Sequence, residues 1–287
     1  MPTLIDFRRR IRSVKNTQQI TRAMKFVAAA KLRRSQEAVF AARPYARAIR
    51  QVLQSAMARI EEPQHPLLAR RPEERILLLL ASGDKGLCGA FNTNVIRKGL
   101  EFGLEHAGKK LGIVAAGKKG RDALRKRRFN LIAEYVSVSA RPDFSHAKEI
   151  SGKIIAAYSA EEVDAVYAIY NEFKSVLAQR LIAEKLLPID EGELQKPAPA
   201  TLVDYIYEQP AGEILNSLLP RHIEAQVFRI LLESAAAENA ARMTAMDSAT
   251  NNAAELIESI TLHMNKVRQA SITREIIEIV SGAASTA

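Results

Sequence analysis

Apolar residues near the N-terminus recur at helical spacing over many turns. From Val39 to Ile60 they follow one another at alternating steps of three and four positions, a mean of about 3.5, which is the coiled-coil period. The same spacing starts at Leu4 and resumes as a shifted stripe after two polar positions. We therefore predict one long helix over residues 3–60, with a kink at Pro44 because a proline ring displaces a carbonyl of the preceding turn.

A second long helix is predicted at the other end of the chain. Residues 221–281 lack proline and are rich in Ala, Glu, Leu, Ile and Met, most of which are strong helix formers. Pro220 is the expected start, after a turn or two over residues 213–219, and Gly282 is the expected stop. Apolar residues recur about every 3.6 positions, so this helix also has one apolar stripe that needs a partner.

Packing the two stripes against each other gives a long antiparallel two-helix coiled coil. The helices have to run in opposite directions because a domain separates them in sequence. If residue 60 lies opposite about residue 214, residue 4 lies opposite about residue 270, and about fifteen C-terminal residues project as a single helix. At about 1.5 Å per residue the pair would span roughly 80–100 Å.

The residues between the helices alternate between strand-like and helix-like patterns. Apolar runs of strand length occupy 75–82, 111–116, 130–138, 163–170 and 179–187, and helical stretches occupy 92–106, 117–127 and 143–159. This alternation is typical of a mostly parallel sheet with helices on its faces, so we predict a central Rossmann-like α/β domain. Proline-containing linkers at 61–74 and 188–210 give domain boundaries of 1–60, 75–190 and 212–287.

The charge distribution points to acidic partners. Of the formal net charge of +10, residues 1–60 contribute fourteen Lys and Arg against two acids, while residues 212–287 carry six basic and nine acidic groups. Nucleic acid, anionic lipid or an acidic protein surface would suit the basic N-terminal helix, and a solvated basic face with no partner is the alternative. The longest apolar run, Ile76–Ala81, is too short to span a bilayer, so any membrane association is expected to be peripheral.

A glycine-rich stretch, ASGDKGLCGAFNTN at 81–94, raises the question of a nucleotide site. Its spacing is GxxGxxG rather than GxGxxG, and GIVAAGK at 112–118 has Lys119 where a P-loop needs Ser or Thr. We interpret both loops as tight turns, and the histidines show no metal-ligand spacing, so no cofactor, metal or catalytic residue is expected. Two alternative functions stay open. A nucleotide-dependent enzyme would be recognised by its binding of ATP or NAD, and a basic coiled-coil nucleic-acid-binding protein by salt-dependent binding to duplex DNA.

Three stretches carry a resemblance to a known family. Residues 11–36 (IRSVKNTQQITRAMKFVAAAKLRRSQ), 86–92 (GLCGAFN) and 265–283 (NKVRQASITREIIEIVSGA) closely resemble the gamma subunit of F-type ATP synthases, and the resemblance continues through the chain in order. It implies a non-catalytic rotor shaft that couples proton flow to ATP synthesis and binds no nucleotide or nucleic acid itself. The implied partners are the ring of three alpha and three beta subunits, where ATP is made, the epsilon subunit and the membrane c-ring.

The resemblance also implies contact residues and a location. Matched positions place a coupling zone at Met24, Lys25, Arg242, Gln269 and Thr273, and contacts with the base of the ring at Lys31, Arg33, Arg34, Lys85 and Cys88. Residues 276–280 would turn in an apolar bearing. The chain lacks the two-cysteine insert of chloroplast relatives and an obvious transit peptide, so the expected location is the cytoplasmic face of a bacterial inner membrane. A mitochondrial protein numbered from its mature start is the alternative.

Overall fold

The computed structural model describes residues 3–58, 60, 65–176, 178–190 and 211–286. Two helices account for nearly half of the chain: α1 (Leu4–Met57) and α6 (Ala211–Thr286). The chain divides into two compact units, one made of residues 1–28 and 243–287 and the other of residues 29–242. Each helix contributes to both units. The three-part division made from the sequence follows secondary structure rather than compactness, and it stays a prediction.

In the first unit, the two helices pack against each other in opposite directions. The Thr21 and Thr250 hydroxyls lie 2.8 Å apart, and the Phe7 ring meets the His263 ring edge-on at 5.1 Å between centroids. Residue numbers therefore rise along one helix as they fall along the other. The antiparallel pairing is confirmed, and the register lies within about one helical turn of the one expected from the apolar stripes.

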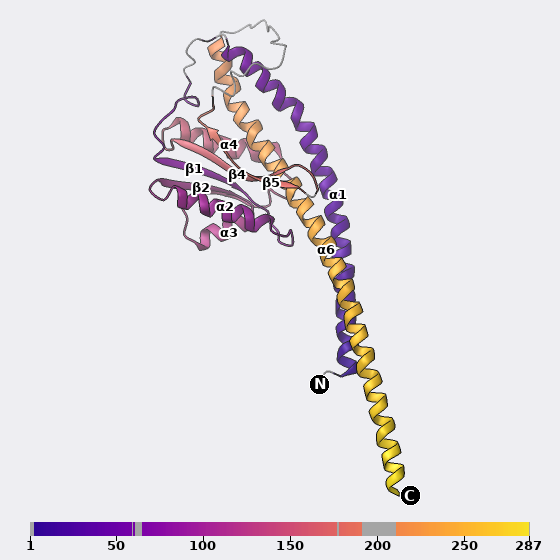
Figure 1. The fold of residues 1–287 in the computed structure, drawn as a ribbon. Helices are drawn as coiled ribbons and strands as arrows, with labels where there is room; N and C mark the ends of the chain where they lie inside the picture. Colours follow the sequence, from indigo (N-terminus) through magenta and orange to yellow (C-terminus); the bar gives the residue numbers. More distant parts are fainter. Residues whose placement is uncertain (1–2, 59, 61–64, 177, 191–210, 287) are drawn as a thin grey trace. The chain divides into compact units, whose positions relative to one another are not determined.

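The second unit contains a five-stranded sheet in the order β3-β2-β1-β4-β5 (Figure 1). The strands are β1 (Arg75–Ala81), β2 (Lys110–Ala116), β3 (Leu131–Tyr135), β4 (Ala165–Phe173) and β5 (Gln179–Leu187). The first four are parallel, and β5 runs antiparallel to β4. This is the strand order of a Rossmann-type sheet with an antiparallel edge, which confirms the predicted α/β class.

Helices cover both faces of this sheet because successive β1 side chains point to opposite sides. On one face Ile76, Leu78 and Leu80 pack with α2 (Phe91–Glu105) and α3 (Lys118–Lys126). On the other face Leu77 and Leu79 share a core with α4 (Phe144–Ser159), the last turns of α1 and the first part of α6. The strand is buried along nearly its whole length, so its sequence is a continuous apolar run.

Two helix ends differ from the sequence expectation. Pro220 was expected to begin the C-terminal helix, but α6 begins at Ala211 and continues through the proline. The prediction was wrong because Leu215 and Leu219 are buried in the core on the N-terminal side of Pro220, and this packing compensates for one lost backbone hydrogen bond. Gly282 was expected to stop the helix, yet α6 runs on to Thr286, since a glycine costs a helix only about 1 kcal/mol.

Pro44 lies inside α1, which is assigned as helix without interruption from Leu4 to Met57. Among the described residues, the helices are all too short or too polar to cross a membrane.

Candidate functional site

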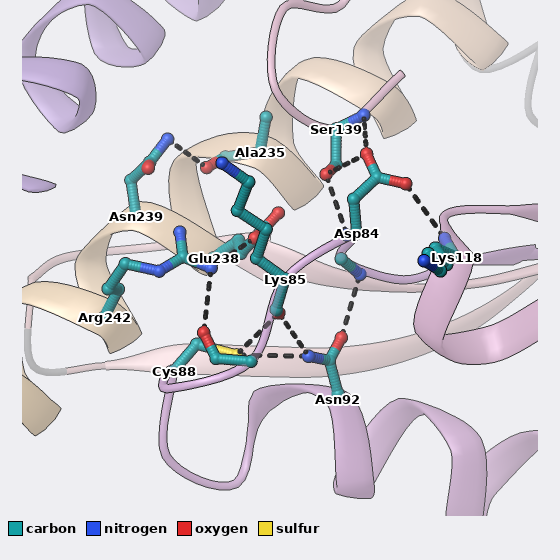
Figure 2. A network of polar contacts seen from close by, with 12 residues as sticks. Asp84, Lys85, Cys88, Asn92, Lys118, Ser139, Ala235, Glu238, Asn239 and Arg242 are labelled. Carbon is teal, nitrogen blue, oxygen red and sulfur yellow. Dashed lines mark hydrogen bonds and ion pairs between the residues drawn. The ribbon is translucent and has the colours of Figure 1, made fainter. Parts of the chain in front are cut away.

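The glycine-rich stretch forms the loop between β1 and α2, and it lies where several elements of the second unit meet (Figure 2). The first turn of α3, the residues that follow β3, and α6 each hydrogen-bond to it. In parallel α/β sheets, this carboxyl edge of the strands is the usual place for ligands. The loop was therefore the place to test for a nucleotide site.

An internal carboxylate occupies the position that an anionic ligand would need. Asp84 Oδ1 accepts hydrogen bonds from the backbone N–H of Lys118, in the first turn of α3, and of Ser137, both at 2.9 Å. Its Oδ2 accepts from the Ser139 hydroxyl at 2.8 Å and from the Ser139 N–H at 3.2 Å. Free amides at a helix N-terminus attract phosphate, but these amides already have an anionic partner. The arrangement explains why a strand, a glycine turn and a helix can occur here without a ligand.

The glycines of this region are required by close packing. A Cβ atom at Gly117 would lie 2.0 Å from the carbonyl oxygen of Ser82, and the residue has a φ of +106°. A Cβ atom at Gly83 would lie 2.8 Å from Cδ of Glu238 on α6. At Gly117 the backbone lies against the backbone of a neighbouring segment, which only glycine permits, whereas the close neighbour of Gly83 is the end of a side chain. The interpretation of the glycines as packing and turn residues accounts for what is seen at both positions.

Arg242 of α6 holds the loop through a hydrogen bond and is itself held by a buried ion pair with Glu238 of the same helix. Arg242 Nη2 lies 2.6 Å from Oε1 of Glu238 and 3.3 Å from the carbonyl oxygen of Gly86, to which it donates. Only 14% of the Arg242 side chain and 6% of the Glu238 side chain are exposed. Asn239, one position further along α6, donates to the Ser35 hydroxyl of α1 at 3.3 Å. The loop, α6 and α1 are thus connected by polar contacts with little access to water.

Cys88 sits at the centre of the loop with an unreactive thiol. It is 2% exposed, packs with Phe91 and Ala237, and accepts a hydrogen bond from the Asn92 amide at 3.2 Å. Burial raises the pKa of the Cys88 thiol, and the opposing effect of Arg242 is smaller. A buried thiol with a raised pKa is neither a nucleophile nor a metal ligand at neutral pH. No cluster of three or more His, Cys, Asp or Glu side chains able to hold a metal ion occurs among the described residues.

Part of the residue set expected from the resemblance comes together here. Lys31, Lys85 and Arg242 line one small cavity of about 30 Å³, and Cys88 belongs to the same glycine-rich loop as Lys85. Arg33 and Arg34 are exposed on α1, and Arg33 pairs with Glu37 at 3.1 Å. Cationic side chains therefore gather on this part of the second unit.

The other four expected residues, Met24, Lys25, Gln269 and Thr273, belong to the first unit. Met24 is half-buried, and Lys25 Nζ forms an ion pair with Oδ1 of Asp247 at 2.6 Å. Gln269 and Thr273 are exposed on the last turns of α6. The five residues of the expected coupling zone are therefore divided, four in one unit and Arg242 in the other.

Sequence reasoning missed the residues that organise the loop. Asp84, Glu238 and Ser139 were not singled out, although together they hold both the turn and its contact with α6. One signal was present for Glu238, because a Glu and an Arg four positions apart on a helix are placed to pair. For Asp84 the signal was an acidic residue inside a glycine-rich, phosphate-loop-like turn.

Two long helices that pair antiparallel in one unit, and a Rossmann-type α/β sheet in the other, define the structural class of the chain. A family model described as ATP synthase matches residues 3–286. The chain is 52% identical to the ATP synthase gamma chain of Solibacter usitatus and 47% identical to that of Desulfitobacterium hafniense, covering 99% of each chain. The chain therefore belongs to the ATP synthase gamma chain family.

Solved structures agree with the fold. The rotor of the Euglena gracilis mitochondrial ATP synthase matches with a TM-score of 0.66 at 21% identity, covering 94% of this chain and 98% of that one. A chain of the Tetrahymena thermophila mitochondrial ATP synthase central stalk and c-ring structure matches with a TM-score of 0.63 at 25% identity, covering 80% and 99%. Family membership decides between the functions that the sequence left open: the chain is the central rotor subunit of an F-type ATP synthase, and it is non-catalytic.

Proposed function

We propose that this chain transmits rotation between the membrane sector and the catalytic ring through direct contacts of its basic helix and loop surfaces. In this proposal it turns inside three alpha and three beta subunits, and its α/β domain stands beside the epsilon subunit on the c-ring. Proton flow drives the rotation, and ATP is made on the beta subunits. Similar solved structures include a mitochondrial ATP synthase rotor and an assembly of F1 with a c-ring, which supports this assignment of partners.

One observation carries the proposal: the two terminal helices are paired antiparallel, and the C-terminal end of α6 extends beyond the start of α1. The Phe7–His263 contact lies one turn from the start of α1, so the residues of α6 beyond about 267 have no α1 residue opposite them. Ile272, Ile276 and Val280 in that segment are 48–62% exposed. An exposed apolar helix end is unfavourable in water, so we assign it to an apolar bearing formed by partner subunits.

The coupling contacts are proposed to be electrostatic and individually modest. Lys31, Arg33, Arg34 and Lys85 would face acidic groups at the base of the ring, while Arg242 and Cys88 act through the loop that they hold. Two unit charges about 4 Å apart interact by about 4 kcal/mol near a protein surface and by less in salt. A few such contacts could bias the conformation of one catalytic subunit without preventing the next step of rotation.

The upper contacts would be made by Met24, Lys25, Gln269 and Thr273. Met24→Lys adds a second cation beside Lys25, whose own charge is paired with Asp247. We expect this variant to lower proton pumping per ATP hydrolysed more than it lowers recovery of the chain with the alpha and beta subunits. Inverted membrane vesicles measure the pumping, and quantitative mass spectrometry of the purified complex measures assembly.

Met24→Leu is the matched control, because it nearly conserves volume and adds no charge, and it should leave both quantities unchanged. Normal pumping by the Met24→Lys complex at normal assembly would remove Met24 from the coupling zone. Native mass spectrometry of the complex tests the rotor assignment itself, which requires one copy of this chain for three alpha and three beta subunits.

The proposed location is the cytoplasmic face of a bacterial inner membrane, held peripherally through the c-ring. Washing inverted vesicles at low ionic strength should then release this chain together with the catalytic subunits. Retention of the chain by vesicles that have lost the alpha and beta subunits would argue against a purely peripheral attachment.

A further inference from the structure

A large cavity in the second unit lies between α1, α6 and the edge strand β5. Its volume is about 1250 Å³. The wall on α1 runs from Val39 to Arg50, and the wall on α6 runs from His222 to Glu233. Glu184 to Leu186 of β5 and residues 188–190 form the floor, and Arg70, Arg71 and Phe144 complete the lining. The cavity is separate from the glycine-rich loop, because the two share no lining residue.

The cavity interrupts the apolar stripe of α1. Val39 and Ile49 are each 7% exposed, and Leu53 is fully buried, so the stripe is covered at both ends of the interval. Between them the stripe positions are Ala42 and Ala46, which are half-buried and face the cavity. Two small side chains leave room where larger ones would close the space. The interval from residue 39 to 50 is about 17 Å long, or three helical turns.

The lining carries more positive than negative charge. It includes six arginines and Lys185, against the carboxylates of Glu184, Asp190 and Glu233. Glu184 pairs with Arg229 at 2.6 Å and Asp190 with Arg70 at 3.2 Å, so two of the three carboxylates are already used. Lys185 and Arg71 pair with carboxylates outside the lining, those of Glu73 and Glu161. His222 adds no charge at neutral pH, because burial lowers its pKa to about 4.

The excess positive charge is concentrated on α1. Arg43 and Arg47 lie four positions apart, which places them on one side of the helix beside the alanines. This wall therefore combines a short apolar stripe with a row of guanidinium groups. Its complement is a surface with an apolar stripe and a row of carboxylates.

One buried polar atom of the lining has no hydrogen-bond partner among the residues that the structure describes. Glu233 is 7% exposed, its Oε1 lies 3.9 Å from Arg229, and its Oε2 accepts no hydrogen bond. Buried side-chain oxygens in proteins are nearly always hydrogen-bonded. A ligand that donates a hydrogen bond to this oxygen would satisfy it, so the cavity offers both anion-binding groups and one acceptor.

We propose that the cavity is a docking site for an amphipathic, acidic helix of about three turns supplied by a partner protein. A helix fits better than a small molecule, because small-molecule sites are typically about 300–1,000 Å³. It also suits a groove between two helices, where ridges of side chains pack at interaxial distances of about 8–10 Å. Its carboxylates would meet Arg43 and Arg47, its apolar stripe would cover Ala42 and Ala46, and one of its donors would reach Glu233.

Photo-crosslinking in the assembled ATP synthase tests the proposal. Tyr45 lines the cavity and is 50% exposed, so p-benzoylphenylalanine can replace it with room for the added benzoyl group. Phe40 is on α1, 59% exposed and outside the lining, which makes it the matched control position. After irradiation, mass spectrometry should identify a peptide from another polypeptide, with carboxylates at helical spacing, at Tyr45 and not at Phe40.

Charge reversal gives the second arm. Arg43→Glu with Arg47→Glu should reduce the crosslink at Tyr45 at least tenfold, while Lys148→Glu with Arg127→Glu, the same charge change at exposed positions elsewhere, should leave it within twofold. Circular dichroism checks that both variants keep their helix content. Crosslinks confined to this chain, no crosslink at all, or a partner peptide without carboxylates would each overturn the proposal. Recovery of the alpha and beta subunits with the chain is measured separately, so a failure of the rotor assignment can be told apart from a failure of the docking proposal.

Discussion

Replacing Asp84 by glycine should turn the loop after β1 into an anion-binding site. In the native chain, the Asp84 carboxylate accepts hydrogen bonds from three backbone amides, those of Lys118, Ser137 and Ser139. The substitution leaves all three donors without their anion and leaves room at the first turn of α3. Phosphate or sulfate is the natural replacement, because helix N-termini and clustered amides bind such ions.

The expected destabilisation follows from these contacts. Hydrogen bonds to a charged acceptor contribute roughly 1.5–3 kcal/mol each, but water reaches these amides, so about 1 kcal/mol each is a better figure. Loss of the anion at the start of α3 adds about 0.5 kcal/mol. The total of about 3.5 kcal/mol corresponds to a change of at least about a hundredfold in the local opening equilibrium, since about 1.4 kcal/mol is a factor of ten.

Hydrogen exchange measured by mass spectrometry is the suitable assay, because a chain of two compact units need not unfold in one step. Peptides that contain Lys118 and Ser137–Ser139 should exchange about a hundredfold faster in the Asp84→Gly chain. Addition of about 50 mM sulfate should restore at least tenfold of this protection in the variant and change nothing in the native chain. Asp84→Asn, which keeps one acceptor oxygen but no charge, should lie between the two.

Equal exchange in the native and Asp84→Gly chains would refute the reasoning, as would a sulfate effect of the same size in both. Either result would mean that the amides at the start of α3 do not depend on Asp84.

Three further predictions concern stability. Burial favours the neutral form of His222 and lowers its pKa to about 4, below that of the unfolded chain, so its contribution to stability is lost as pH falls from about 6.5 to 4. His222→Gln should remove about 3 kcal/mol of this pH dependence of the unfolding free energy, measured in urea, and an unchanged pH dependence would count against the prediction. Gly117→Ala should cost about 3 kcal/mol or more, seen as a lower melting temperature, because its Cβ would meet the Ser82 carbonyl; a melting temperature within a degree of the native value would contradict this. The Asp164 side chain is 4% exposed, and Arg75 holds the pKa of its carboxyl below the usual range. Asp164→Asn should therefore lower the free energy of unfolding by about 2–4 kcal/mol at pH 7, and by progressively less as pH falls through that lowered pKa; an equal loss at pH 7 and pH 2 would exclude the ion pair as the cause.

The large elements could be predicted because their patterns are local and long. Apolar residues at a mean step of about 3.5 over twenty positions leave few alternatives to a helix that needs a partner. The chain order of strands and helices then limits the middle to a mostly parallel sheet. Pro220 shows where this reasoning fails: the rule that proline starts a helix is local, while burial of Leu215 and Leu219 in the shared core is not.

The loop's chemistry depended on contacts that no local pattern contains. Asp84 and Ser139 are 55 positions apart and meet only because of the way the chain returns to the same edge of the sheet. Arg242 was matched by resemblance to a partner contact, and the side-chain geometry adds that it is largely buried against Glu238. Resemblance identified the positions, and the fold decides which of them can reach a partner directly.

The state of Cys88 has a practical consequence for spectroscopy. The chain has a single cysteine, which is 2% exposed and has a raised thiol pKa, so it should react slowly with maleimides. A cysteine engineered on the surface can therefore carry a fluorophore or spin label in the otherwise native background. Single-molecule tracking of such a probe would need no prior removal of thiols from this subunit.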